Sequence, residues 1–141
     1  MTDPTHRENP RVGTVERATR ESSIVYTVDL DGTGQADIDT GLPFFDHMLT
    51  ALTAHGSFDI KLHANGDTDV DAHHTVEDTG ILLGATLAEA LGDKAGVRRF
   101  ASVRVPLDEA LVEAVLDLSG LPYLHYEIDP PGVKILGDPP F

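Results

Sequence analysis

The spacing of apolar residues changes along this chain between a period of two and a helical period, and this change restricts the possible fold more than any other feature. Residues 24–30, 36–38 and 58–64 carry apolar side chains at alternate positions beside turn sequences, which predicts three strands, the second returning from the first. Residues 44–55 and 73–91 carry them at intervals of three and four, which predicts two helices. The sequence therefore predicts an α+β fold in which a sheet is backed by helices.

The two predicted helices have recognisable ends and one apolar stripe each. Pro43 suits a first helical turn, whose amide donors lack partners, and Gly56 and Gly92 are typical residues at which a helix ends. The stripes expected to face the sheet consist of Phe45, Met48, Leu49 and Leu52 in the first helix and of Val76, Gly80, Leu83, Leu87 and Leu91 in the second.

We expect three segments along the chain. Residues 1–13 are polar and carry two prolines, which predicts a flexible N-terminal tail, so the fold is expected to begin near Thr14. Residues 14–96 are predicted to form a first β/α half-domain, and residues 97–141 to begin a second one, with strands near 103–107, 112–118 and 123–128. Because no helix follows these strands and the end is rich in Pro and Gly, the second half-domain is expected to be incomplete.

The composition of the chain limits which partners it can bind and which side chains can bind a metal ion. The formal charge of −14, from 24 acidic and 10 basic residues, repels nucleic acid and anionic lipid alike. The N-terminal segment lacks the pattern of a secretory signal, and no apolar stretch approaches membrane-spanning length. A cytoplasmic protein without nucleic-acid or membrane partners is therefore expected. Since the chain has no Cys, His and carboxylate side chains are the available metal ligands.

The strongest candidate for chemistry is the segment His73-His74-Thr75-Val76-Glu77-Asp78 at the start of the second predicted helix. On a helix, His73 and Glu77 share a face, whereas His74 lies about 100° further round. Two such imidazoles can serve two metal ions, and the pattern differs from the HExxH and HxxEH motifs of zinc proteases. His47, near the start of the first helix, could approach the same site. Three imidazoles and one carboxylate are compatible with manganese, iron or zinc.

Each of these histidines also has an ordinary structural explanation. A His-His pair on a helix is often only surface-exposed, and a single His beside an apolar stripe, such as His47, is often a hydrogen-bonded core residue. His55 could simply interact favourably with a helix C-terminus. The remaining histidines are expected to be structural or solvent-exposed: His6, His63 and His125.

Carboxylates and arginines near the predicted strand ends are further candidates. Glu21, Asp108 and Glu109 could enter a shared pocket, although most carboxylates of an acidic protein are merely solvated. Arg98 and Arg99 form an uncommon basic pair in a chain with ten basic residues. One of them could bind a phosphate through a forked pair of hydrogen bonds.

Taken together, these motifs resemble the imidazoleglycerol-phosphate dehydratase family in order and spacing, over nearly all of the chain after the tail. The most specific segments are Asp46-His47-Met48 and His73-His74-Thr75-Val76-Glu77-Asp78. The others are Arg20-Glu21-Ser22, residues 40–49, Gly66-Asp67, Gly92-Asp93-Lys94, Arg99-Phe100, residues 106–110 and residues 116–120.

The resemblance implies a fold of two similar halves in the ribosomal protein S5 domain 2-like arrangement, assembled into a shell of twenty-four identical subunits with active sites between subunits. The ligands of two Mn²⁺ ions would be His47, His73, His74 and Glu77. The residues that contact substrate would be Glu21, His47, His55, His73 and Arg99. Glu21 would be the leading acid/base, with Glu77 as a further catalytic group.

The implied reaction is the dehydration of imidazole glycerol phosphate to imidazole acetol phosphate in histidine biosynthesis, through a metal-stabilised imidazolate. The chain departs from the family pattern in two ways. The segments of the family's second half, including another HHxxE motif, do not follow Phe141, and Leu121 stands where the family's SGRP turn has Arg. The alternatives are a truncated, catalytically silent paralogue that binds a divalent ion or joins the shell, and a metallohydrolase whose two ions activate water.

Overall fold

The computed structural model describes residues 10–128, which form six strands and two helices. These residues are grouped in two compact units, the first reaching Asp93 and the second beginning at Lys94. Most of the predicted N-terminal tail, with His6, and the Pro- and Gly-rich end after residue 128 lie outside the described residues. Within residues 10–128, no helix is both long enough and apolar enough to span a membrane.

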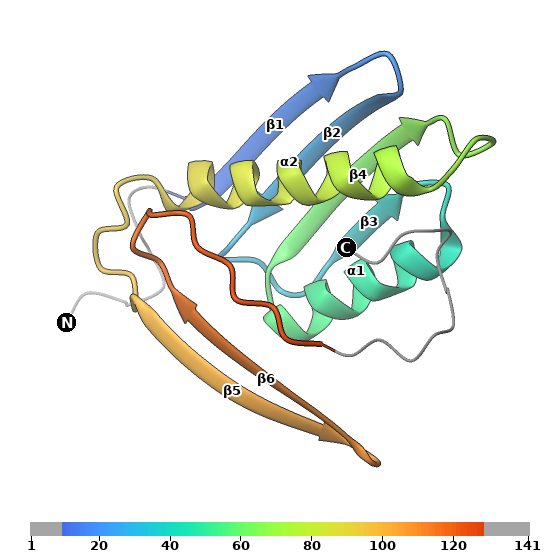
Figure 1. The fold of residues 1–141 in the computed structure, drawn as a ribbon. Coiled ribbons are helices and arrows are strands. Elements are labelled where there is room, and N and C mark those ends of the chain that lie inside the picture. Colours follow the sequence, from blue (N-terminus) through green and yellow to red (C-terminus); the bar gives the residue numbers. More distant parts are fainter. Residues whose placement is uncertain (1–9, 129–141) are drawn as a thin grey trace. The chain divides into compact units, whose positions relative to one another are not determined.

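The first unit is a four-stranded sheet with the strand order β1-β2-β4-β3. Its strands are β1 (Val12–Ala18), β2 (Ser22–Asp29), β3 (Ala36–Asp39) and β4 (Asp59–Gly66). The helices α1 (Pro43–Gly56) and α2 (His73–Leu91) lie over one face of this sheet (Figure 1). The predicted α+β arrangement of a sheet backed by helices is therefore confirmed.

Two strands differ from the sequence predictions. The alternation pattern does not predict β1, which begins at Val12, two residues before the expected start of the fold at Thr14. β3 is expected to return against β2, but it instead runs parallel to β4. The reason is that α1 connects β3 to β4 as a crossover, and a helical crossover places two adjacent strands in the same direction. β2 pairs antiparallel with β1 on one side and with β4 on the other.

Both helices form where the sequence predicts them. α1 begins at Pro43, and the turn after it contains Ser57 in the left-handed conformation, with φ 58°, so that Gly56 is the last helical residue and not the terminator. α2 ends at Leu91, and Gly92 follows with its amide bonded back to the last helical turn.

The core lies between the sheet and the helices, and the predicted stripes are confirmed only in part: Phe45, Leu49, Leu83 and Leu87 pack in the core, but the most deeply buried residues of α2 lie outside its predicted stripe. In α1, Leu49 and Thr53 are buried, whereas Met48 and Leu52 are 41% and 42% exposed. The buried residues of α2 are Thr75, Asp78, Thr79, Leu82, Thr86 and Ala90. The buried residues of the sheet are mainly Ile24, Tyr26, Val28, Ile60 and Leu62. Small threonine and alanine side chains let α2 lie close to the sheet, and a search for large apolar residues overlooks such a face.

The second unit contains the antiparallel hairpin of β5 (Phe100–Leu107) and β6 (Ala110–Asp117). The register places eight apolar side chains on one face of this hairpin: Ala101, Val103, Val105, Leu107, Ala110, Val112, Ala114 and Leu116. On the other face, Arg104 forms an ion pair with Glu113 at 2.5 Å. The strand expected at residues 123–128 is not formed, because these residues pair with no neighbouring strand within the described chain.

Acid should weaken the first unit through Asp59, at the start of β4. Its Oδ1 atom accepts the amide hydrogens of Gln35, at 2.8 Å, and Thr33, at 2.7 Å, and these bonds lower the pKa of the carboxyl below its ordinary value of 3.8. A lowered folded-state pKa contributes stability that is present above the unfolded pKa and lost as pH falls through the folded pKa. We expect wild type to exceed Asp59→Asn in stability at neutral pH, with the difference vanishing in acid. Urea unfolding at several pH values measures this; a difference independent of pH would contradict the assignment.

Candidate functional site

The first turn of α2 carries the His73-His74-Thr75-Val76-Glu77-Asp78 segment. The helix begins at His73, whose backbone amide donates a hydrogen bond of 2.8 Å to Oδ1 of Asp71. This side chain satisfies one of the amide donors that every helix start leaves unpaired. The local sequence thus fixes the orientation from which the two adjacent imidazoles project.

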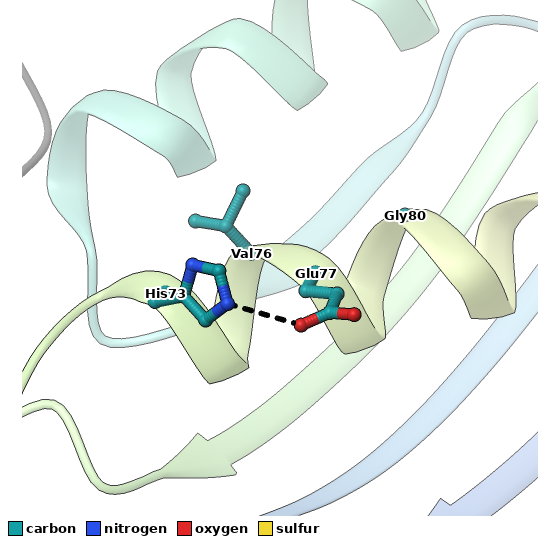
Figure 2. Close-up of a pocket in the computed structure, with 4 residues that line it drawn as sticks. All are labelled: His73, Val76, Glu77 and Gly80. Atoms are coloured by element: carbon teal, nitrogen blue, oxygen red, sulfur yellow. Dashed lines mark ion pairs between the residues drawn. The ribbon is translucent and has the colours of Figure 1, made fainter. Parts of the chain in front are cut away.

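His73 and Glu77 lie side by side on one face of α2, as their spacing predicts. The Nε2 atom of His73 is 3.2 Å from Oε2 of Glu77 (Figure 2). Both side chains, together with Val76 and Gly80, line a pocket of about 500 Å³. One imidazole nitrogen and one carboxylate oxygen therefore meet at a concave surface where a small molecule or an ion can reach both.

His74 points to a different place, where Asp67 holds it. Its Nδ1 atom is 3.0 Å and 3.2 Å from the two carboxylate oxygens of Asp67. This hydrogen bond is the main cause that raises the pKa of His74 above its ordinary value, and the charges of Asp67, Glu21 and Glu77 add to it. With its Nδ1 atom directed to a carboxylate, His74 keeps its Nε2 atom available to bind another group. The rings of His73 and His74 are 5.6 Å apart at an interplanar angle of 72°.

Glu21 reaches the same region from the turn between β1 and β2. Its backbone carbonyl accepts the amide hydrogen of Asp67 at 3.0 Å, which joins this turn to the end of β4. Its side chain is exposed and close enough to His74 to raise the pKa of that imidazole. The structure therefore brings Glu21 near His74, although 53 positions separate the two residues in the chain.

The other predicted site residues belong to other elements. His47 and His55 are exposed on α1. Arg99 belongs to the second unit, where its guanidinium pairs with Asp117 at 2.6 Å and 3.0 Å. Asp108 and Glu109 occupy the exposed turn of the β5–β6 hairpin. Arg98, Leu121 and His125 are exposed in the second unit, and His63 lies exposed on β4 beside Asp37.

In the described part of the chain, no three His, Asp or Glu side chains gather closely enough to hold a metal ion. The convergence of His47 with His73 and His74 thus stays a prediction. The donors that do meet, an imidazole nitrogen and a carboxylate oxygen 3.2 Å apart, are of the type that first-row divalent ions accept. These residues fit part of a metal site, and further ligands have to come from outside this group.

Two functional candidates, Asp67 and Asp78, lie in motifs named from the sequence but have no role assigned to them there. Asp67 is the partner of His74, and Asp78 accepts a hydrogen bond of 2.5 Å from the Oγ atom of Ser22. The signal for Asp67 is weak, because an acidic residue after Asn65-Gly66 is also typical of a turn. Asp78 carries a clearer signal, since it is a charged residue on a helix face that otherwise holds Thr75, Thr79 and Leu82.

A family model described as imidazoleglycerol-phosphate dehydratase matches residues 40–138. Among curated proteins, the imidazoleglycerol-phosphate dehydratase of Corynebacterium glutamicum is 63% identical over 121 residues, which cover 86% of this chain and 60% of that protein. The enzyme of the same name from Nocardia farcinica is 57% identical over 130 residues, 92% of this chain and 59% of that protein. The chain thus spans about 60% of the length of these curated relatives.

Solved structures agree with this similarity. The crystal structure of imidazoleglycerol-phosphate dehydratase from Staphylococcus aureus superimposes with a TM-score of 0.76 at 31% identity, covering 88% of this chain and 67% of that one. The corresponding structure from Pyrococcus furiosus gives a TM-score of 0.72 at 30% identity, covering 86% and 64%. The α+β fold described above is therefore shared with these proteins.

Proposed function

Because the chain belongs to the imidazoleglycerol-phosphate dehydratase family, we propose that it acts in histidine biosynthesis as a hydro-lyase, converting imidazole glycerol phosphate to imidazole acetol phosphate. The observation that supports this proposal most is the arrangement around the start of α2. There His73 and Glu77 line one pocket, and Glu21 approaches His74 from the β1–β2 turn. We place the reaction in the cytoplasm, where a soluble biosynthetic enzyme of this kind would work.

The chain's own residues have distinct tasks in this proposal. Glu21 is the group that takes or returns a proton at its carboxylate oxygen, because it is exposed and its charge acts on the imidazole of His74. Asp67 orients His74 so that the Nε2 atom is the free nitrogen. Val76 gives the pocket an apolar wall beside the carboxylate of Glu77, and this wall reduces the access of water to that side. Arg99 would bind the phosphate if its guanidinium exchanged Asp117 for that group.

Manganese is the proposed cofactor, with two ions per site held by His47, His73, His74 and Glu77. Imidazole nitrogens and carboxylate oxygens suit this ion, and the described residues of one chain supply an incomplete set of them. When bound, the ion would supply positive charge that stabilises negative charge on the imidazole ring of the substrate. The missing ligands and His55 are proposed to join the site from identical subunits in a large shell.

A catalytically silent relative is the second candidate. One observation favours it: Leu121 is 80% exposed where the family motif has a phosphate-binding Arg. Such a protein would still bind a divalent ion or join the shell, but it would not release product.

Turnover of imidazole glycerol phosphate by the full chain with Mn²⁺ tests the proposal. We expect formation of a ketone product that absorbs when enolised, and we expect Glu21→Gln to reduce kcat by about 10²- to 10⁴-fold, the usual contribution of a general acid or base. Glu16→Gln is the matched control, because Glu16 is an exposed carboxylate on β1, in the same hairpin. Manganese binding without turnover would support the silent relative, and turnover unchanged in Glu21→Gln would refute the role of Glu21.

A further inference from the structure

Asp78 is a buried carboxylate that the proposed reaction does not use. It is 7% exposed and lies on the face of α2 that packs against the sheet. Its Oδ2 atom accepts the hydroxyl hydrogen of Ser22 at 2.5 Å, and its Oδ1 atom is 3.3 Å from a guanidinium nitrogen of Arg17. Because burial of an unpaired charge is costly, these partners make Asp78 a fixed point between α2 and the β1–β2 hairpin.

Ser22 ends a turn that is closed by its own hydrogen bonds. The hydroxyl oxygen of Thr19 accepts the amide hydrogens of Glu21, at 3.1 Å, and of Ser22, at 3.0 Å. The amide of Thr19 donates to the carbonyl of Ser22 at 2.8 Å. The four residues from Thr19 to Ser22 therefore move together, so a bond that holds Ser22 also determines where Glu21 lies.

A second connection holds the same turn from the other side. The amide of Asp67 donates to the carbonyl of Glu21, and the carboxylate of Asp67 holds the ring of His74. His74 and Asp78 are four residues apart, so they lie one above the other on α2. The turn is thus attached to α2 at two successive positions of one face, directly through Ser22 and indirectly through Asp67.

We propose that Asp78 is a positioning residue: by holding Ser22 it fixes the Thr19–Ser22 turn on α2 and so sets Glu21 at its place relative to His74. Asp78 acts through Ser22 and touches neither substrate nor metal. The role in catalysis rests on the proposed function, whereas the attachment itself can be measured on the protein without any ligand. The experiment can therefore refute the catalytic role and the attachment of the turn to α2 independently of each other.

The test compares Ser22→Ala with Ser23→Ala in the full chain. Ser22 is buried and bonded to Asp78, while Ser23 is its exposed neighbour on the opposite face of β2. Loss of a hydrogen bond to a buried charge should increase amide exchange at Asp67 and Ser22 by about ten-fold. Core amides of β4, such as that of Leu62, should change much less, and Ser23→Ala should leave all of them within about two-fold of wild type.

Turnover supplies a readout that a purely structural role would not change. We expect Ser22→Ala to lower kcat while KM stays near its wild-type value, because Glu21 is misplaced but the pocket at His73 and Val76 remains. Ser22→Thr, which keeps the hydroxyl group, should recover part of the loss. The proposal is overturned if exchange at Asp67 is unchanged in Ser22→Ala, or if all amides accelerate equally. A wild-type chain without turnover would refute the proposed function, while the exchange data would still decide the attachment.

Discussion

Replacement of His73 by alanine is expected to abolish the response of the protein to Mn²⁺. In the wild type, an ion that binds only the folded state adds about 2.7 kcal/mol of stability when its concentration is 100 times its Kd. His73→Ala removes the imidazole whose Nε2 atom lies 3.2 Å from Glu77, so the carboxylate alone faces the pocket. Thermal unfolding with and without Mn²⁺ measures the difference, and turnover of any active preparation should fall to the background rate.

His63→Ala is the matched control for this experiment. His63 is an exposed histidine on β4, and its Nε2 atom is 3.5 Å from a carboxylate oxygen of Asp37. The substitution therefore removes a His–carboxylate pair like that of His73 and Glu77. It should leave the response to Mn²⁺ intact. If His73→Ala were stabilised by Mn²⁺ as strongly as the wild type, His73 would not be a ligand, and the metal assignment would have to be abandoned.

Gly13→Ala is expected to destabilise the first unit by about 3 kcal/mol, at the upper end of the usual cost of overpacking. A Cβ atom at this position of β1 would lie 2.3 Å from the carbonyl oxygen of Thr86 and 2.9 Å from the amide nitrogen of Ala90. Both are backbone atoms of α2, so the clash is relieved only if the helix moves away from the strand. The free energy of unfolding in urea measures the loss.

Gly84→Ala, in the middle of α2, is expected to have the opposite effect and to stabilise the protein. Apart from the adjacent backbone of α2 itself, no described atom lies within 4 Å of a Cβ placed at Gly84, so the substitution should raise the free energy of unfolding by about 0.5–1 kcal/mol through the better helix propensity of alanine. A neutral Gly13→Ala would mean that β1 and α2 do not approach each other as closely as the structure has them.

The helices were the most predictable part of the fold because their ends carry strong local signals. Pro43 marks the start of α1 and Gly92 follows the end of α2, and both mark positions through backbone restrictions that do not depend on distant contacts. β1 could not be recognised from alternation, since its inward positions are Gly13, Val15 and Arg17, of which one is a large apolar residue. Its assignment depends on pairing with β2.

The pairing of β3 could be inferred only by weighing the connections as well as the strands. The order strand, 14-residue helix, strand from β3 through α1 to β4 favours a parallel pair, and this preference outweighs the short distance along the chain between β2 and β3. The buried face of α2 is a similar case. Thr75, Thr79 and Thr86 pack against the sheet because they are small, which hydrophobicity alone does not indicate.

The site was predictable wherever it depended on a single helix. The shared face of His73 and Glu77 follows from helical geometry, and the structure confirms it. The approach of Glu21 to His74 depends on how the β1–β2 turn meets the end of β4, so periodicity cannot reveal it. The roles of Asp67 and Asp78 cannot be predicted for the same reason: their partners, His74 and Ser22, come from other elements.

The uncharged face of the β5–β6 hairpin affects how this polypeptide behaves at high concentration. Within the described residues β5 and β6 pair only with each other, so each presents unpaired backbone groups along one side, next to exposed residues such as Val103, Val105 and Val112. An open edge beside apolar side chains is a template to which strands of other molecules can add, and this is the usual first step of aggregation. The protein should therefore be expressed and stored at low concentration. The substitution Val112→Lys, which places a charge on this face, should reduce the aggregation.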